Sequence, residues 1–232
     1  FRAMLIIRND AGYLRLSELL TAAYVGKDRN VHHAELNPEW LENGDNSGLI
    51  CLSGAHYGEV GVNLLNGNED AARAAALKYV AWFPDAFYLE LQRLPERPEW
   101  EACVSGSVKL AEELGLPVVA THPTQFMSRD DFNAHEARVC IAGGWVLTDK
   151  KRPRDFTPSQ FFIPPETMLE RFADLPEALE NTVEIAKRCN IHITLGKNFL
   201  PLFPTPDGLS LDDYLVKLSN EGLQERMVQL YP

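Results

Sequence analysis

The fold class follows from residues 87–121, which have the sequence FYLELQRLPERPEWEACVSGSVKLAEELGLPVVAT. Both ends of this stretch, residues 87–91 and 117–121, are short apolar runs that predict strands, and between them residues 99–114 predict a helix that ends at Gly115. Continuous apolar runs of this kind are typical of strands that are buried on both faces, as in parallel sheets. The order strand, helix, strand therefore indicates α/β architecture with crossover helices.

The same alternation extends along the chain from residue 4 to about residue 143. Further short apolar runs predict strands at residues 4–7 and 49–52, and either Asn9 or Asp10 can cap the helix that follows the first of them. Further helices are predicted at residues 58–65, 68–82, 165–172 and 176–189, with a brief strand at 191–194 and an amphipathic helix that opens at 209–213. These elements leave a doubly wound sheet and a barrel open as alternatives.

The charge balance excludes some classes of function. Among 232 residues there are 22 Lys and Arg against 33 Asp and Glu, a formal net charge of −11. A free-standing nucleic-acid binder needs a basic face, because its affinity comes largely from Lys and Arg at phosphates. With 45% hydrophobic and 24% charged residues, the composition is instead that of a globular protein with a real core.

Cysteine spacing and hydropathy predict the compartment. The four cysteines are far apart and none forms a CxxC pair, so neither a zinc ribbon nor a disulfide framework is indicated. No apolar run approaches the roughly 18 residues of a membrane span, and no leader pattern is found at the start. We expect a cytoplasmic protein without a membrane partner.

Two of the six histidines are candidates for a pocket at the carboxyl ends of the predicted strands. His56 follows a predicted strand and a tight turn, and His122 directly follows the strand predicted at 117–121. Barrels and α/β sheets place their sites at the carboxyl ends of strands, so these two residues are expected to line a pocket. Phosphate-binding glycine motifs are absent, and Ser105-Gly106-Ser107 is more typical of a helix packing face than of a nucleophile.

One basic concentration occurs in the acidic chain. It comprises Lys150, Lys151, Arg152 and Arg154, in a loop that also carries aromatic residues. Such a run is consistent with a phosphate or nucleic-acid contact. The alternative is a solvated loop whose cations pair with surrounding acids, and the net charge favours this second interpretation.

Several stretches in order along nearly the whole chain resemble one family. They are Leu52-Ser53-Gly54, Gly115-Leu116-Pro117-Val118-Val119-Ala120-Thr121, Asp131-Phe132-Asn133-Ala134-His135-Glu136, Lys151-Arg152-Pro153-Arg154, Pro176-Glu177-Ala178-Leu179-Glu180-Asn181-Thr182 and Phe199-Leu200-Pro201. They resemble the PHP (polymerase and histidinol phosphatase) domain of the alpha subunits of bacterial replicative DNA polymerase III.

The resemblance implies a fold and a domain division. The fold is an incomplete, distorted seven-stranded β/α barrel that lacks its opening strands and is followed by a C-terminal helix. The barrel domain would occupy residues 1–204, and residues 205–232 would form a linker and the first helix of the polymerase palm and thumb region.

The resemblance also implies a metal site that this chain lacks. Family members with an intact site have Cys where this chain has Ala55, and Asp and His where it has Pro123 and Gln125. None of these three side chains offers an anionic ligand to a cluster of hard cations. We therefore expect no metal and no catalytic residue in this segment, with Mg²⁺ expected only in the polymerase active site of the parent protein.

The implied function is that of a segment of a DNA-directed DNA polymerase. The segment itself would be a metal-free structural module that docks the proofreading exonuclease subunit. Other replicase subunits and template-primer DNA are the further partners expected of the parent. The alternative is an active metal-dependent PHP phosphoesterase or 3′-5′ exonuclease within the barrel itself.

Overall fold

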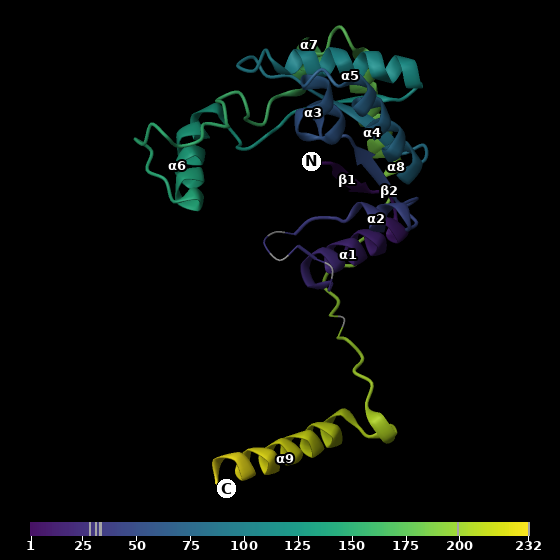
Figure 1. Cartoon of the computed structure of the whole chain (residues 1–232), viewed down its shortest axis with the longest axis vertical. Coiled ribbons are helices and arrows are strands. Elements are labelled where there is room, and N and C mark those ends of the chain that lie inside the picture. The colour runs from purple at the N-terminus through teal and green to yellow at the C-terminus, as the bar shows by residue number, and fades with distance from the viewer. Residues whose placement is uncertain (28, 31, 33, 199, 232) are drawn as a thin grey trace. The chain divides into compact units, whose positions relative to one another are not determined.

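A computed structural model describes residues 1–232 except residues 28, 31, 33, 199 and 232. The chain divides into two compact units, Phe1–His192 and Ile193–Pro232. The first unit contains the strands and eight of the nine α-helices found in the described part of the chain (Figure 1).

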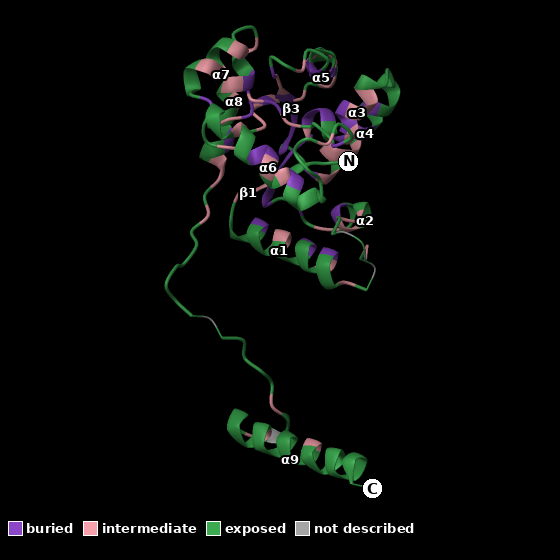
Figure 2. Ribbon diagram, turned by 90° about the vertical axis from the view of Figure 1, so that its left-hand side faces the viewer, coloured by how far each residue is buried: buried purple, intermediate pink, exposed green. Residues whose placement is uncertain are grey.

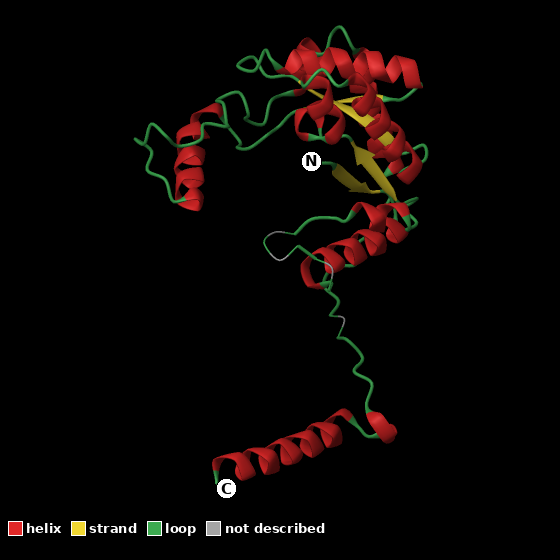
Figure 3. Cartoon of the chain, viewed as in Figure 1, coloured by secondary structure: helices red, strands yellow, loops and turns green. Residues whose placement is uncertain are grey.

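A four-stranded sheet forms the centre of the first unit (Figure 3). The strands lie in the order β1 (Met4–Ile7), β2 (Leu49–Leu52), β3 (Phe87–Gln92) and β4 (Val118–Thr121). Strands β2, β3 and β4 are parallel, as expected, and all four strands occur where the apolar runs predict them.

Strand β1 differs from this pattern because it pairs antiparallel with β2, with Ile7 opposite Leu49. The intervening segment contains two helices, α1 (Asp10–Val25) and α2 (Pro38–Glu42), so the chain leaves and returns at the same end of the sheet. A single crossover helix would have carried it to the opposite end. Helix α1 begins as predicted, since the Asn9 side chain accepts a 3.0 Å hydrogen bond from the Gly12 N–H.

The remaining helices of the first unit confirm the predicted ones to within a residue or two at each end, except for the helix at residues 132–143, whose bounds were not predicted. They are α3 (Glu59–Leu65), α4 (Glu69–Trp82), α5 (Trp100–Leu114), α6 (Phe132–Gly143), α7 (Pro165–Arg171) and α8 (Pro176–Arg188), with short 3₁₀ turns at Ala55–Tyr57 and Arg129–Asp131. Alternating strands and helices from β2 onward thus produce the expected α/β arrangement.

The core lies against β2 and β3, whose residues are buried along almost their whole length (Figure 2). Leu49, Ile50 and Leu89 are fully buried there. Helix α4 reaches this layer through buried alanines such as Ala72 and Ala76, whose small side chains allow the helix to come close. A second cluster around Phe172 joins α5, β4 and α8.

Helix α8 covers β4, the edge strand of the sheet. The Asn181 side-chain amide donates a 2.8 Å hydrogen bond to the Val118 carbonyl of β4. This bond satisfies a backbone acceptor that has no neighbouring strand on that side.

The brief strand predicted at residues 191–194 is wrong. The last backbone hydrogen bond before this segment joins the Asn190 N–H to the Arg8 carbonyl, at 2.7 Å. Residues 192–194 are exposed, and none of residues 191–194 makes a backbone hydrogen bond within the described part of the chain. Apolar and β-branched residues do not form a strand without a neighbouring strand to complete the ladder.

The second unit contains the 3₁₀ turn η3 (Pro206–Gly208) and helix α9 (Leu211–Leu230). Ser210 caps α9, because its hydroxyl accepts a hydrogen bond from the Asp213 N–H at 3.1 Å. No residue of α9 is buried. Across all the described residues, no helix combines the length and apolar character needed to cross a membrane.

Candidate functional site

The carboxyl ends of β2, β3 and β4 meet at one edge of the sheet, because parallel strands end together. Glu90 of β3 is buried at this edge, with 3% of its surface exposed. Its carboxylate accepts hydrogen bonds from the Gly54 N–H (3.1 Å), the Thr121 hydroxyl (2.5 Å) and the Gln92 amide (3.1 Å). The Ser53 hydroxyl in turn accepts one from the Glu90 N–H, at 2.9 Å. One side chain thereby joins the ends of all three strands.

Glu90 was not among the site residues predicted from the sequence. Within the described part of the chain, no Lys, Arg or His nitrogen lies within 4.0 Å of its carboxylate, so only neutral donors hold it. A buried carboxylate needs such donors, because burying its charge without hydrogen bonds would destabilise the fold by on the order of several kcal/mol. A carboxylate inside an otherwise apolar strand was the available signal.

His56 lies just beyond β2 and is buried against Trp100. The two rings stack with centroids 3.6 Å apart and planes 22° from parallel. Neither ring nitrogen of His56 has a hydrogen-bond partner. Burial, with smaller contributions from the Arg97 and Arg2 guanidiniums, lowers the pKa of His56 to about 4. The imidazole is therefore neutral at pH 7.

His122 directly follows β4, and both of its ring nitrogens are engaged. Nδ1 lies 3.2 Å from an Arg171 Nη1, which can only donate, so Nδ1 accepts. Nε2 therefore carries the proton and donates to the Phe161 carbonyl at 3.0 Å. Burial and then the Arg171 charge lower the pKa of His122. His56 and His122 are thus at the same edge of the sheet but contact different residues.

The three positions that depart from the family pattern do not supply metal ligands. Ala55 is buried in the turn after β2 at φ 46°, in the left-handed region, and has no donor atom. The carbonyl of Pro123 is taken up by a 3.1 Å hydrogen bond from Gln160, and Gln125 offers only a neutral amide on an exposed side chain. Among the described residues, no group of three His, Cys, Asp or Glu side chains is placed to hold a metal ion. At these three positions the side chains therefore offer no anionic ligand to a metal ion.

A cavity of about 370 Å³ lies beside the carboxyl end of β3. Trp100, Pro95, Pro98 and three arginines, Arg93, Arg97 and Arg171, line it. Two of its lining residues contact the histidines, since Trp100 stacks on His56 and Arg171 donates a hydrogen bond to His122. Neither Trp100 nor the arginines were singled out from the sequence, since they come from the loop before α5, from α5 and from α7.

The predicted basic loop does not gather its four cations at one point. Arg152 is buried and its guanidinium lies 2.5 Å from the Glu136 carboxylate of α6, while its Nε donates to the Leu147 carbonyl at 3.2 Å. Lys150, Lys151 and Arg154 are exposed. A phosphate contact by this loop stays a prediction, and it would rest on the exposed three.

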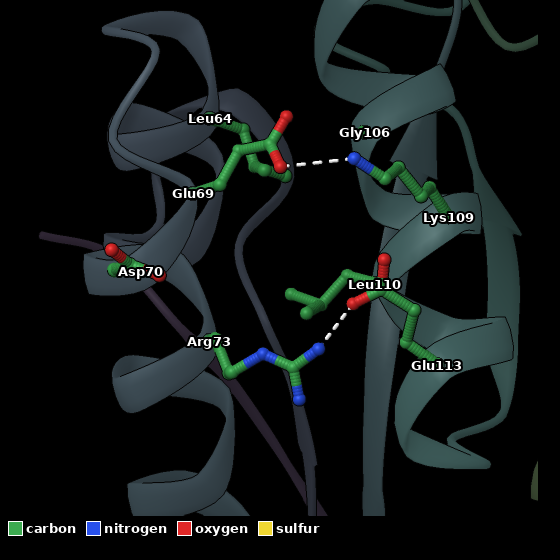
Figure 4. Close-up of a pocket in the computed structure, with 8 residues that line it drawn as sticks. All are labelled: Leu64, Glu69, Asp70, Arg73, Gly106, Lys109, Leu110 and Glu113. Carbon is green, nitrogen blue, oxygen red and sulfur yellow. Dashed lines mark hydrogen bonds and ion pairs between the residues drawn. The ribbon is translucent and has the colours of Figure 1, made fainter.

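A second hollow, of about 160 Å³, lies between α4 and α5, and neither His56 nor His122 lines it (Figure 4). Two ion pairs cross it, Arg73 with Glu113 and Lys109 with Glu69. Gly106 and Leu64 also line it, and the lack of a side chain at Gly106 leaves room for the Leu64 side chain. Its cations are neutralised by their partners, and it is smaller than the roughly 300 Å³ of a typical ligand site.

Comparison with known proteins identifies the class first. Residues 1–94 match the PHP domain family, which agrees with the mixed α/β content and the four-stranded sheet. The first unit of the structure therefore contains a PHP domain.

Relatives then identify the particular family. The chain is 98% identical over 232 residues to DNA polymerase III subunit alpha of Neisseria meningitidis serogroup A, covering 100% of this chain and 20% of the relative. It is 47% identical over 224 residues to DNA polymerase III subunit alpha of Escherichia coli strain K12, and 45% over 231 residues to that of Pseudomonas aeruginosa, covering 97% and 100% of this chain and 19% of each relative. Over its whole length the chain matches a segment of DNA polymerase III subunit alpha, and it spans about a fifth of the length of these relatives.

Proposed function

We propose that this chain is a segment of the catalytic alpha subunit of a bacterial replicative DNA polymerase, in which it acts as a structural and docking module rather than as a metal enzyme. The name of the relatives supports the first part of the proposal. The parent protein would carry out DNA replication as a DNA-directed DNA polymerase, a nucleotidyltransferase in the cytoplasm, with Mg²⁺ in its own active site.

The observation that carries the non-catalytic role is the chemistry of the strand ends. Ala55 stands at a ligand position without a donor, and both nitrogens of His122 are already bonded. The buried Glu90 carboxylate at this edge already accepts hydrogen bonds from three strand-end donors. Arginines, which repel metal cations, take the place beside them.

The proposal includes the finer architecture. We propose that β1–β4 belong to a distorted seven-stranded barrel whose opening strands lie outside this chain. The parallel order of β2–β4 and the PHP match support this arrangement. The barrel domain would comprise residues 1–204, and residues 205–232 would be the linker and first helix of the palm and thumb region.

The partners follow from the same proposal. The proofreading exonuclease subunit would dock on this module, with the other replicase subunits and template-primer DNA bound by the parent protein. The formal net charge of −11 supports a protein partner for this segment, with the DNA-holding surface elsewhere in the parent.

A nuclease assay tests the non-catalytic role. The full-length subunit, purified without the exonuclease subunit, is incubated with a 3′-mismatched primer-template and Mg²⁺, Mn²⁺ or Zn²⁺. We expect no digestion with any of the three. Digestion that is lost on chelation and lost in His122→Ala, but retained in the matched variant Arg73→Ala, would establish the alternative of an active phosphoesterase or exonuclease.

The docking role needs its own measurement. Purified exonuclease subunit is crosslinked to the full-length subunit, and the crosslinked peptides are mapped. Crosslinks within residues 1–192 are the expected result. Crosslinks confined to the rest of the parent would show that this module is not the docking site.

A further inference from the structure

The cavity beside Trp100 combines an apolar wall with guanidinium groups. Trp100, Pro95 and Pro98 provide flat apolar surface, and Trp100 is held in place because its ring stacks on His56 at 3.6 Å. Arg97 and Arg171 reach the same cavity of about 370 Å³, which is within the size range of small-molecule sites. A rigid aromatic surface next to cations is suited to a ligand with an apolar part and a negative charge.

Arg171 has a charge without an acidic partner. Its side chain is partly buried, and its Nη1 donates to two neutral acceptors, the Arg93 carbonyl at 3.3 Å and Nδ1 of His122 at 3.2 Å. Within the described residues, no carboxylate lies within 4.0 Å of the Arg171 guanidinium. Burial lowers the pKa of Arg171, and the more distant Glu96 carboxylate opposes this effect only in part, so the charge is desolvated without a directly bonded carboxylate.

The other two arginines differ in how much donor capacity they keep. Arg93 is fully used, since it binds Glu101 at 2.7 Å and Asp174 at 2.6 Å. Arg97 lies 3.6 Å from Glu99 and otherwise donates only to backbone carbonyls, and its buried Nε has no partner. Arg97 and Arg171 therefore retain N–H donors that could bind a ligand in the cavity.

We infer that this cavity binds a small organic anion, a carboxylate or phosphate ester carried on an apolar group, with Arg171 and Arg97 holding the anion and Trp100 contacting the apolar part. Guanidiniums bind both anions through parallel N–H donors. The hollow between α4 and α5 is the internal contrast, because each of its two cations already has a carboxylate (Figure 4).

The test follows Trp100 in the full-length subunit labelled with 5-fluorotryptophan. Fluorine NMR identifies the Trp100 signal by its loss in Trp100→Phe. Phenyl phosphate and phenylacetate are then titrated, with benzyl alcohol as the neutral probe of similar shape. We expect a saturable shift of the Trp100 signal with at least one anion and none with benzyl alcohol. A response to phenyl phosphate alone would define a phosphate-ester site, and a response to phenylacetate alone would define a carboxylate site.

Variants determine whether Arg171 is responsible. Arg171→Gln should raise the half-saturating anion concentration by about tenfold or more, because a charge-assisted hydrogen bond is lost. Arg73→Gln, in the other hollow, should leave it unchanged. If Arg171→Gln does not fold, Arg97→Gln serves in its place with the same expectation. The inference is overturned by no saturable shift up to about 10 mM anion, by an equal response to benzyl alcohol, or by unchanged binding in the arginine variant.

Discussion

Glu90 and Glu136 are both buried carboxylates, yet different kinds of group hold them. Glu90, at the strand ends, is bonded to a backbone N–H, a hydroxyl and an amide, all neutral. Glu136, on α6, faces the buried guanidinium of Arg152 at 2.5 Å, and one of its oxygens has no partner. A carboxylate can be buried with either set of partners, but the consequences of losing one partner differ.

The two sites differ in how many groups stabilise the buried carboxylate. At the strand ends three donors from three strands share one carboxylate, so the loss of one leaves two. In the α6 region a single guanidinium compensates the charge and also binds the Leu147 carbonyl, so one side chain fixes both α6 and the loop after it. The first region should therefore tolerate substitution better than the second.

The largest effect is expected from Arg152→Ala, which leaves Glu136 buried without its cation. Breaking a buried pair in this way costs about 3–5 kcal/mol. Hydrogen exchange of the α6 amides in the full-length subunit should accelerate accordingly, while the exposed neighbour variant Lys151→Ala should exchange like the wild type. Unchanged exchange in Arg152→Ala would mean that the ion pair does not hold this region.

A pH effect of somewhat smaller size is expected at the strand ends, from His56. Its pKa is about 4 in the folded protein and 6.5 in the unfolded chain, so the unfolded state binds more protons between these values. Stability is complete above about pH 6.5 and falls as the pH is lowered toward 4, by on the order of 3 kcal/mol. His56→Phe keeps a ring against Trp100 and should remove this pH dependence. The same acid sensitivity in wild type and variant would exclude His56 as its cause.

Glu90→Gln should have a moderate effect, since it preserves shape but presents an amide N–H₂ to groups that donate. We expect a loss of about 1–3 kcal/mol, measured by hydrogen exchange of β3. Glu184→Gln, an exposed change of the same kind, is the control and should have no effect there. A loss of stability as large as that of Arg152→Ala would contradict the view that three donors together stabilise the Glu90 carboxylate.

The smallest effect is expected from Arg73→Ala, which removes an ion pair whose two side chains are 44% and 39% exposed. Exposed pairs of this kind contribute about 0–1 kcal/mol. Denaturant unfolding should therefore barely distinguish this variant from the wild type. A loss of more than about 2 kcal/mol in the free energy of unfolding would show that solvent exposure does not explain the difference between this pair and the buried pair of Glu136 and Arg152.

Much of the fold was predictable because its signals are local. The four strands and most helices of the first unit follow from apolar runs, helical spacing and caps such as Asn9, but α2 and the bounds of α6 were not predicted. The direction of β1 was not predictable in this way, because it depends on α2 returning the chain to the end of the sheet it left. The segment 191–194 was misassigned because its residues favour a strand but have no neighbouring strand.

The site was less predictable because its contacts join distant parts of the chain. The strand-end positions of His56 and His122 follow from the predicted elements, and their role as a pocket stays a prediction. The bond from Arg171 to His122 spans 49 residues, and the pair of Arg93 with Asp174 spans 81. No local pattern indicates such pairs. The basic loop shows the same limit, since nothing near Arg152 in the sequence marks it as the buried member of the group.

The hydrogen bond from the Asn181 amide to the Val118 carbonyl also bears on aggregation. An edge strand with free backbone groups is a template on which another chain can add a strand. Asn181 occupies one of those groups on β4, and α8 packs against this strand. Replacing Asn181 is therefore expected to cause aggregation of newly synthesised chains at high concentration before it measurably lowers the free energy of unfolding.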